Sequence, residues 1–375
     1  MRTQARIDLG AVRANVSVLA DLAGTAQVMA VVKADAYGHG LVPCARAALA
    51  GGATWLGVAF LEEAAALREA GLQAPLLAWL FGADEDLRPA VRSGVDLGVY
   101  TVAELDRVAR AAVAEGRPAR VHLKADTGLS RGGAVPADWP ALCASAAKAE
   151  ADGGVEVVGV WSHLASAGAG PAHPATVRQA TRFGEALEVA GQAGLRPEVR
   201  HLASSGALLT APALRYDLVR VGVAVYGLSP LADVVPTQLG LRPAMTLVSS
   251  VAQVKRVPAG EGVSYGHLYV TTSETSLALV PLGYGDGVPR AAGNRASMLV
   301  RGTQRRIAGV VSMDQCVLDI GDDEVAAGDE VILFGPGDAG EPTAREWADA
   351  LGTIDYEVVT RIGPRVPRVH VGEAG

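Results

Sequence analysis

VVKADAYGHG, residues 31–40, runs from a short β-branched segment into Lys33 and then into a polar turn that contains Asp35, Tyr37 and His39. Most lysines are solvated surface charges, so one interpretation of Lys33 is a side chain whose stem packs on the protein while its amine reaches water. The other interpretation is functional. An amine at the mouth of an apolar site loses part of its preference for a proton and becomes a nucleophile toward aldehydes and ketones. Lys33 alone suggests Schiff-base chemistry without proving it, and Tyr37 could reach a phosphate nearby.

Outward from this stretch, short β-branched runs alternate with segments of helical composition from residue 28 to about residue 223. The intervening segments, such as FLEEAAALREAG at 60–71, have apolar positions three and four apart and end in glycine, as crossover helices do. Eight runs predict a (β/α)8 TIM-type barrel, because open doubly wound sheets more often stop at about five or six strands. The predicted strands are residues 28–33, 55–60, 75–80, 95–100, 120–125, 155–161, 198–203 and 217–223.

The pattern changes after the barrel. Residues 230–243, PLADVVPTQLGLRP, are rich in proline and predict a linker. From residue 244 onward, short β-rich runs are separated by Gly, Asp and Pro turns, with one helical segment at 343–352. We therefore expect a barrel domain over residues 1–233 and a C-terminal, mainly-β domain over residues 234–375.

Composition and charge narrow the class of partner. The chain has 375 residues, of which 50% are hydrophobic and 19% charged, and no run reaches the roughly 18 apolar residues of a membrane span. Cys44, Cys143 and Cys316 lie far apart without a CxxC pair, which fits a reducing cytoplasm and suggests neither disulfides nor a thiolate metal site. A net charge of −7 without a basic block argues against a nucleic-acid or membrane partner. We expect a small-molecule ligand.

Polar side chains follow five of the predicted strands at their carboxyl ends, where catalytic groups of (β/α)8 barrels collect. After the last two strands, ASSG (203–206) and VGVAVYG (221–227) combine small residues with free backbone amides, at the place where barrels bind phosphate. Taken alone, ASSG could equally be an ordinary helix N-cap. The polar residues and glycine at these strand ends are Lys33, Lys124, Asp126, Arg131, His163, Ser204, Ser205, Arg220 and Gly222.

Eight motifs, spread over almost the whole chain, resemble those of the alanine racemase family, the fold type III enzymes that use pyridoxal 5′-phosphate (PLP). This resemblance implies a cytoplasmic homodimer with shared active sites that interconverts L- and D-alanine and supplies D-alanine for cell-wall peptidoglycan. The motifs are AVVKADAYGHG (30–40), HLKADTGLSRGG (122–133), WSHLASA (161–167), DLVRVGVAVYGLSP (217–230), VSYGHLY (263–269), LGYGDGVPR (282–290), VSMDQ (311–315) and TIDYEVV (353–359).

By this resemblance Lys33 would hold PLP covalently and Arg220 would face its pyridine nitrogen. A guanidinium does not readily give up a proton, so it would keep that nitrogen unprotonated, weaken the ring as an electron sink and limit transamination. Trp79 and Ser204 stand where the family commonly has a smaller aliphatic residue and an asparagine. The other cofactor-binding residues that the resemblance implies are His163 and, around the phosphate, Tyr37, Ser205, Gly222, Val223 and Tyr356.

Racemisation requires proton transfer on both faces of the α-carbon, and the resemblance implies two bases. Lys33 would serve one face, and Tyr265 of the partner subunit would serve the other. A tyrosine has a reference pKa near 10, so a positive neighbour must help it toward phenolate. Arg131 is the candidate neighbour and would also hold the substrate carboxylate, while His163 would link Tyr265 to Arg220 by hydrogen bonding.

Four further residues complete the predicted site. Lys124 resembles a position that can carry a carbamate in family members, which would turn a repelling cation beside Arg131 into an anion. Tyr284, Met313 and Asp314 would come from the β domain, with Tyr284 and Met313 near the substrate entrance. On local sequence alone, Met313 is more typical of a core residue and Tyr284 of a cross-strand aromatic.

Three other functions remain open. A non-catalytic PLP carrier would bind PLP without α-proton exchange, but that class ends after the barrel. Basic amino-acid decarboxylases also pair a PLP barrel with a β domain, yet they usually place an acidic residue at the pyridine nitrogen, where this chain has Arg220. A serine-preferring racemase is a close neighbour, and Tyr356 mildly favours alanine. No metal is expected in any of these functions.

Overall fold

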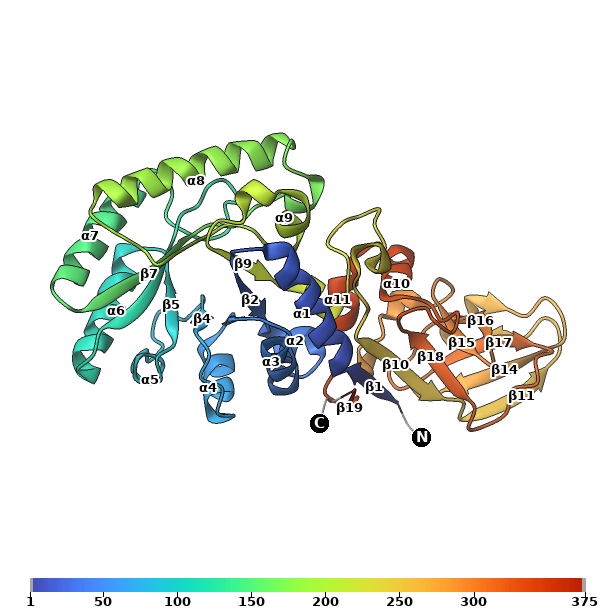
Figure 1. The fold of residues 1–375 in the computed structure, drawn as a ribbon. Coiled ribbons are helices and arrows are strands. Elements are labelled where there is room, and N and C mark those ends of the chain that lie inside the picture. Colours follow the sequence, from blue (N-terminus) through green and yellow to red (C-terminus); the bar gives the residue numbers. More distant parts are fainter. Residues whose placement is uncertain (1–2, 373–375) are drawn as a thin grey trace.

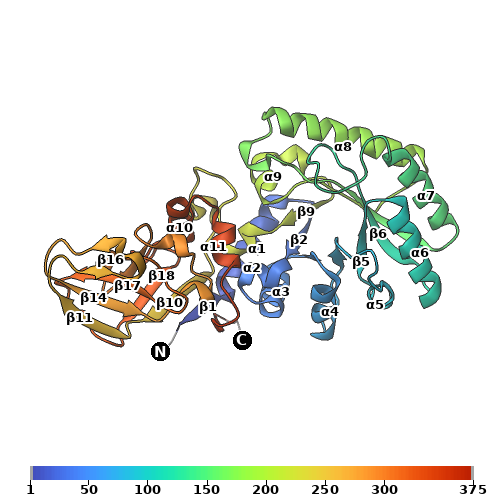
Figure 2. The same cartoon turned by 180° about the vertical axis from the view of Figure 1, so that it is seen from behind.

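The computed structural model describes residues 3–372, in which a parallel barrel is joined to a mainly-β unit (Figure 1). The barrel and the β unit lie side by side, and the view from behind agrees (Figure 2). α1 (Leu9–Ala23), α10 (Ala344–Leu351) and α11 (Asp355–Thr360) lie near their junction. The predicted fold class, a (β/α)8 barrel followed by a mainly-β domain, is confirmed.

All eight predicted barrel strands are present in one sheet, and neighbours in its ladder pair in parallel. The ends of the sheet meet where Ser204 and Arg220 form a parallel bridge and the Arg220 N–H donates to Ala203 O at 2.9 Å. The strands are β2 (Gln27–Val31), β3 (Trp55–Val58), β4 (Leu76–Ala78), β5 (Asp96–Val99), β6 (Ala119–Lys124), β7 (Val155–Trp161), β8 (Val199–His201) and β9 (Leu218–Val221).

Helices connect the strands and pack against the outside of the sheet. Each helix buries an apolar stripe against the strands and leaves its opposite face in contact with solvent. In α6 (Val102–Glu115), Thr101 caps the first turn by accepting from Glu104 N at 3.1 Å, and Gly116 ends the helix with φ of 65°. Within residues 3–372, each helix is too short or too polar to span a lipid bilayer. The other right-handed α-helices between barrel strands are α3 (Leu41–Ala50), α4 (Leu61–Glu69), α5 (Arg88–Arg92), α7 (Trp139–Ala151), α8 (Pro174–Gln192) and α9 (Ser205–Thr210).

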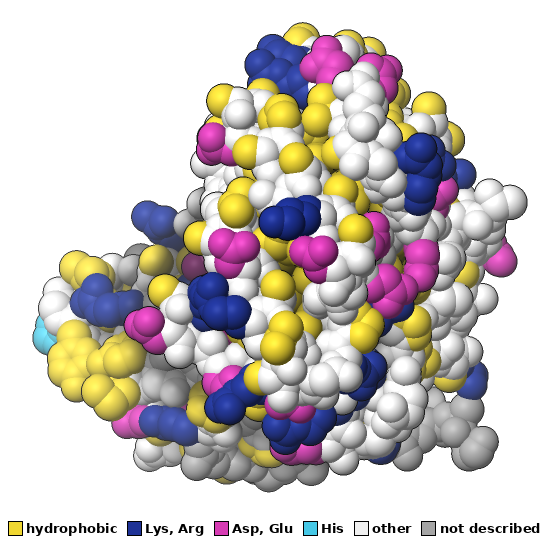
Figure 3. Space-filling view, turned by 90° about the vertical axis from the view of Figure 1, so that its left-hand side faces the viewer, with side chains coloured by type: hydrophobic (Ala, Val, Ile, Leu, Met, Phe, Trp, Pro, Cys, Tyr) yellow, Lys and Arg dark blue, Asp and Glu magenta, His cyan; other side chains and the backbone are white. Residues whose placement is uncertain are grey.

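The outer face on the barrel side of the molecule carries Lys and Arg side chains interspersed with Asp and Glu (Figure 3). Alternating signs of this kind create no extended field of one sign over that face. The described residues of this face therefore form no patch of one charge that would attract a charged ligand.

The mainly-β unit contains a six-stranded sheet of order β16-β15-β18-β10-β1-β19, a three-stranded sheet of order β11-β14-β17 and the pair β12-β13. The helical segment predicted at 343–352 is α10, which Thr343 caps by accepting from Glu346 N. The strands are β10 (Met245–Ser250), β11 (Gln253–Val257), β12 (Gly262–Val263), β13 (Tyr269–Val270), β14 (Thr275–Val280), β15 (Ser297–Val300), β16 (Thr303–Arg306), β17 (Cys316–Gly321), β18 (Glu330–Phe334) and β19 (Arg368–Val371).

The strand β1 (Gln4–Asp8) belongs to the six-stranded sheet although it precedes the barrel in sequence. It pairs antiparallel with β10 and parallel with β19, so both of its edges are hydrogen-bonded. Residues at the start of the chain therefore pack with residues near 245 and 370, which the sequence did not predict.

The predicted turn after Lys33 is α2 (Lys33–Gly38), a short left-handed helical turn. Residues 34–37 have φ of 53–54°, and none of them is glycine. This conformation costs roughly 1–2 kcal/mol per residue, because it brings Cβ close to the following carbonyl oxygen. Contacts from two distant elements hold the turn: Glu63 Oε1 accepts from Ala34 N at 2.6 Å, and Arg368 Nε donates to Gly38 O at 2.9 Å.

Asn15 on α1 ties the barrel to the segment that leaves it. Its Nδ2 donates to Val225 O at 3.1 Å and to Arg242 O at 2.9 Å, and its Oδ1 accepts from Arg242 N at 2.8 Å. Asn15 is 1% exposed, so water cannot replace these partners. One buried amide thus satisfies three backbone groups.

Replacing Asn15 by alanine is expected to lower the free energy of unfolding by about 3 kcal/mol, because it leaves those three backbone groups without a partner. Urea denaturation of the two proteins measures the difference. Ser17→Ala is the matched control, since Ser17 is exposed on the same helix, and a change below about 0.5 kcal/mol is expected there. Equal effects of the two substitutions would contradict the proposed role of Asn15.

Candidate active site

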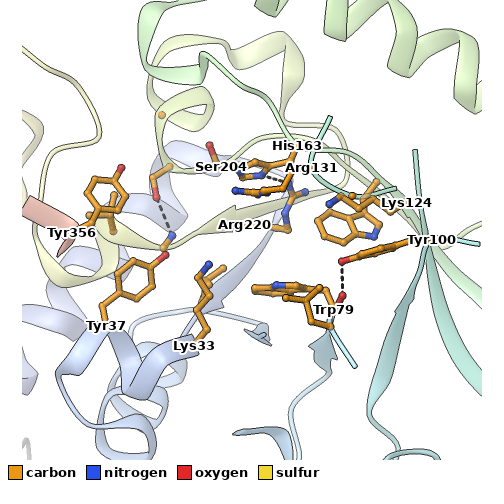
Figure 4. A pocket seen from close by; sticks show the side chains of 18 residues that line it. Lys33, Tyr37, Trp79, Tyr100, Lys124, Arg131, His163, Ser204, Arg220 and Tyr356 are labelled. Atoms are coloured by element: carbon orange, nitrogen blue, oxygen red, sulfur yellow. Dashed lines mark hydrogen bonds between the residues drawn. The ribbon is translucent and has the colours of Figure 1, made fainter. Parts of the chain in front are cut away.

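A cavity of about 560 Å³ lies among the residues that follow the barrel strands (Figure 4). Its lining includes four cationic side chains, and no carboxylate of the described residues lines it, so the cavity suits an anionic ligand. The structure brings twelve of the predicted site residues into this lining: Lys33, Tyr37, Trp79, Lys124, Arg131, His163, Ser204, Ser205, Arg220, Gly222, Val223 and Tyr356.

Lys33 begins the left-handed turn α2 and lies in the lining of the cavity, with its Nζ 5.8 Å from the centroid of the Trp79 ring. Burial lowers the pKa of this amine, the positive charge of Arg131 lowers it further, and Glu63 partly opposes both effects. A lysine with a lowered pKa is neutral, and therefore nucleophilic, at lower pH than an ordinary lysine. The geometry thus favours the functional interpretation of Lys33.

Hydroxyl groups and backbone amides gather at one end of the cavity. Ser205 Oγ accepts from Gly222 N at 2.9 Å, and a Cβ on residue 222 would lie only 2.4 Å from the Tyr37 hydroxyl, so glycine is required for this approach. Burial raises the pKa of Tyr37, and burial together with Asp355 raises the pKa of Tyr356 to about 12. Both phenols therefore stay protonated and can donate hydrogen bonds, as a phosphate group requires.

Arg220, on β9, is 5% exposed and holds its guanidinium in a fixed orientation. Nη1 donates to His201 O at 2.9 Å and Nη2 donates to Ser162 O at 2.7 Å, while His163 Nδ1 lies 3.3 Å from Nη2. Hydrogen bonds to the described residues use Nη1 and Nη2 but not Nε, which leaves one donor for a ligand. Burial lowers the pKa of Arg220 to about 9, so the group remains cationic at neutral pH.

His163 follows β7 and is neutral in this setting. Burial and, to a smaller extent, the positive charges of Arg220, Arg131, Lys124 and Lys33 together lower its pKa to about 3. Its Nδ1 can therefore accept from the Arg220 guanidinium.

Lys124 ends β6 and lies between aromatic rings. Its Nζ is 4.8 Å from the centroid of Tyr100 and 4.7 Å from that of Trp161. Burial, Arg131 and Arg220 lower its pKa to about 8. The loop that follows is shaped by Asp126, whose Oδ1 accepts from the three backbone N–H groups of residues 128–130 and so leads the chain to Arg131.

The predicted residues of the β unit do not reach this cavity in a single chain. Tyr265, Met313 and Tyr284 are 73%, 53% and 44% exposed, and Asp314 binds Arg365 Nη1 at 2.8 Å on the surface. Tyr265 lines a separate hollow in the β unit. Among residues 3–372, no group of three or more His, Cys, Asp or Glu side chains could hold a metal ion.

Two aromatic residues of the lining were missed by the sequence prediction. Tyr100 follows β5 and donates from its hydroxyl to Trp79 O, which fixes the Trp79 backbone at the cavity. Trp161 ends β7, stacks on His201 at 5.5 Å between ring centroids, and is 4% exposed. Both positions are carboxyl ends of predicted strands, so the rule that identified Lys124 could have identified them.

These features define a (β/α)8-barrel enzyme in which a lysine of lowered pKa lines the same cavity as a cluster of hydroxyl groups and backbone amides. The family model of the alanine racemase N-terminal domain matches residues 7–230, and that of the alanine racemase C-terminal domain matches residues 244–370. The chain belongs to the alanine racemase family and is an amino-acid racemase, an isomerase.

Individual relatives cover the whole chain. The alanine racemases of Frankia casuarinae and Thermobifida fusca are each 60% identical to it, over 99% and 98% of this chain and 97% and 98% of their own lengths. The crystal structure of the alanine racemase from D-cycloserine-producing Streptomyces lavendulae has a TM-score of 0.98 at 54% identity, covering 100% of this chain and 98% of that one. The alanine racemase of Bacillus anthracis with bound L-Ala-P has a TM-score of 0.89 at 34% identity, covering 99% and 96%.

The lowered pKa of Lys33 can be tested in the unliganded protein by following its reductive methylation against pH with mass spectrometry. A lowered pKa means that the neutral amine appears as pH rises through a value below 10.5, so modification begins at lower pH. Arg131→Ala removes a repelling cation and is expected to move the onset to higher pH. Arg178→Ala, an exposed change on α8, is expected to leave it unchanged. An onset unaffected by Arg131→Ala would contradict this electrostatic account.

Proposed function

We propose that this protein interconverts L- and D-alanine with PLP as cofactor, by moving the α-proton between the two faces of the α-carbon. The observation that carries the proposal is a cavity lined by four Lys and Arg side chains and by no carboxylate of the described residues, in which Lys33, with its lowered pKa, lies beside a cradle of hydroxyl groups and backbone amides. The names of the related racemases support alanine as the substrate.

The residues of the cavity fit PLP in charge and in hydrogen-bonding groups. The phosphate would lie in the cradle of Tyr37, Ser205, Gly222, Val223 and Tyr356, because two protonated phenols, a serine hydroxyl and the Val223 backbone amide can donate there, while Ser205 Oγ holds the Gly222 N–H. Ser204, Trp79 and His163 would surround the ring. Bound PLP would withdraw electron density from the substrate and make its α-proton acidic.

Lys33 would hold the cofactor covalently and then act as a base on one face of the substrate. Its lowered pKa favours the neutral amine that both roles require. Arg220 would direct its Nε–H toward the ring nitrogen, and as a cation at neutral pH it would not pass a proton to that nitrogen.

Tyr265 of the partner subunit would be the base on the opposite face. In its own chain Tyr265 is 73% exposed and lies near the exposed Leu268, and Met313 and Tyr284 of the same unit are exposed as well. Large exposed apolar side chains gathered on one unit mark interaction surfaces. A symmetric dimer would bring these residues to the partner's cavity, where Asp314 would also lie and where Arg131 would hold the substrate carboxylate.

Lys124 would carry a carbamate. Its pKa of about 8 leaves part of the population as neutral amine near neutral pH, and only the neutral amine adds to carbon dioxide. The resulting anion would lie beside Arg131 and orient its guanidinium toward the substrate.

At the level of the whole molecule, we assign residues 1–233 to the PLP-binding barrel and residues 234–375 to the β domain that completes the partner's site, with β1 as the barrel region's contribution to the β sheet. The product D-alanine would serve cell-wall peptidoglycan, and the enzyme would work in the cytoplasm as a homodimer.

The decisive experiment incubates the protein with PLP and L-alanine in D₂O and follows the Cα proton by NMR, with a chiral assay for D-alanine. Loss of the Cα–H signal together with D-alanine is expected. Lys33→Ala is expected to lower the rate by about 10²–10⁴-fold, whereas Lys148→Ala, a change on α7 outside the cavity, is not. A parallel sample with L-serine measures side-chain preference. Bound PLP with neither exchange nor inversion for any amino acid would overturn the proposal in favour of a carrier.

The shared site makes a separate prediction for mixed dimers. Lys33→Ala and Tyr265→Ala dimers are each expected to be nearly inactive. After subunit exchange, half of the dimers are hybrids with one intact site of two, so about one quarter of wild-type activity should return. Native mass spectrometry establishes that exchange has occurred. No recovery in exchanged samples would place Tyr265 outside the partner's site.

A further inference from the structure

A chain of buried polar side chains crosses the interior of the barrel and ends at Arg220. Arg220 Nη1 lies 3.0 Å from His201 Nδ1, His201 Nε2 lies 2.9 Å from His122 Nδ1, and His122 Nε2 lies 3.1 Å from Asp96 Oδ2. Both histidines are 0% exposed, and Asp96 is 1% exposed. These four side chains, which we call the interior chain, take no part in the site described above except through Arg220.

The interior chain lies where apolar side chains usually fill a barrel. Trp55 packs edge-on against His122 with ring centroids 5.5 Å apart, and Trp161 stacks on His201. Met29, Leu77 and Val158 also form part of this layer, and each is 0% exposed. Polar groups buried in such surroundings are costly unless every partner is present, so their arrangement calls for a role beyond packing.

Both ends of the interior chain fix the direction of its hydrogen bonds. A guanidinium only donates, so His201 Nδ1 must accept and His201 Nε2 must carry the proton. That proton points at His122 Nδ1, which must then accept. At the other end the Asp96 carboxylate only accepts, so His122 Nε2 must carry its proton. The two ends require the same tautomers, and both histidines are neutral.

Asp96 is itself anchored at the opposite end of the barrel. It begins β5, and its second oxygen, Oδ1, accepts from Arg120 Nε at 2.9 Å. Arg120 also donates to Glu156 Oε1 at 3.1 Å, and its side chain is 28% exposed. The interior chain therefore connects the amino-terminal end of the barrel to the end where the cavity lies.

We propose that Asp96, acting through His122 and His201, is a positioning residue for Arg220. By orienting the guanidinium, Asp96 determines which N–H group faces the cofactor ring. Without an acceptor at Asp96 both histidines can reverse, and His201 Nδ1–H then faces Arg220 Nη1–H. Two facing N–H donors repel each other, so the guanidinium rotates and its Nε–H no longer points toward the ring nitrogen of the cofactor. This inference rests on the proposed function only for its consequence in catalysis.

The first test needs no activity. Solid-state ¹⁵N NMR of histidine-labelled protein, loaded with PLP, distinguishes Nδ1–H, Nε2–H and cationic imidazoles, and the chain has 7 histidines to resolve. His122→Gln and His201→Gln samples assign the two signals. Neutral Nε2–H forms are expected at both positions in the unaltered protein. An Nδ1–H or cationic form at either position overturns the proposal.

The second test compares Asp96→Asn with Glu156→Gln, a matched loss of one carboxylate that keeps the interior chain intact. Asp96→Asn is expected to give mixed histidine tautomers, about tenfold lower kcat with little change in KM, and more pyridoxamine phosphate and pyruvate per racemisation. Those products form when the amino group of alanine passes to PLP. Glu156→Gln should change none of these.

The outcomes separate the two proposals. Equal kcat and equal pyridoxamine phosphate in the two variants overturn the positioning role of Asp96. Expected tautomers in a protein that racemises no amino acid support the interior chain and overturn the proposed function. Asp96→Asn could also lose kcat while its thermal unfolding is unchanged and its histidines keep their original tautomers. That result overturns the role of the two histidines in transmitting the effect of Asp96 to Arg220.

Discussion

The left-handed turn at residues 34–37 is the constraint on which the rest of the site depends. Four residues in this conformation cost roughly 4–8 kcal/mol, which is comparable to the net stability of a whole domain. The surrounding contacts must offset that cost. Glu63 holds one end of the turn, while Arg368 and His370, from β19, bind the carbonyl groups of Gly38 and His39 at the other. The turn directs both Lys33 and Tyr37 toward the cavity.

Arg220 is the point where the cavity and the barrel interior meet. One part of its guanidinium is fixed by backbone carbonyls and by the interior chain, and the remaining donor is free for a ligand. A cation held in this way acts without reorganising, which is how a protein gives a fixed charge its largest effect on a reacting group. The same burial that fixes Arg220 also lowers the pKa of its neighbour His163, so the charge stays on the guanidinium.

The sequence was sufficient to predict the barrel, because each strand and helix carries its own hydrophobic periodicity. It was also sufficient to place Lys33 and Arg220 in one site, because the carboxyl ends of the strands converge in a barrel. It could not predict the left-handed turn, since Ala34 and Ala36 carry no signal for positive φ. It also missed α11, which brings Tyr356 to the barrel, and the pairing of β1 with distant strands. His122 begins the motif HLKADTGLSRGG (122–133), but whether its side chain faces the barrel interior depends on the register of the strand. The alternation of apolar and polar residues alone does not fix that register. Tyr265 stays a prediction because its proposed target lies in another chain.

The place of β19 also sets an order of events during synthesis. β19 is translated after every strand of the barrel, yet it pairs with β1 and supplies the side chains that grip the turn beside Lys33. A ribosome-bound chain that has completed only its barrel therefore has an unpaired first strand and a lysine turn that is held at only one end, by Glu63. Such a chain exposes both edges of β1 to aggregation. The contacts that hold the turn beside Lys33 are in this way completed only after β19 has emerged.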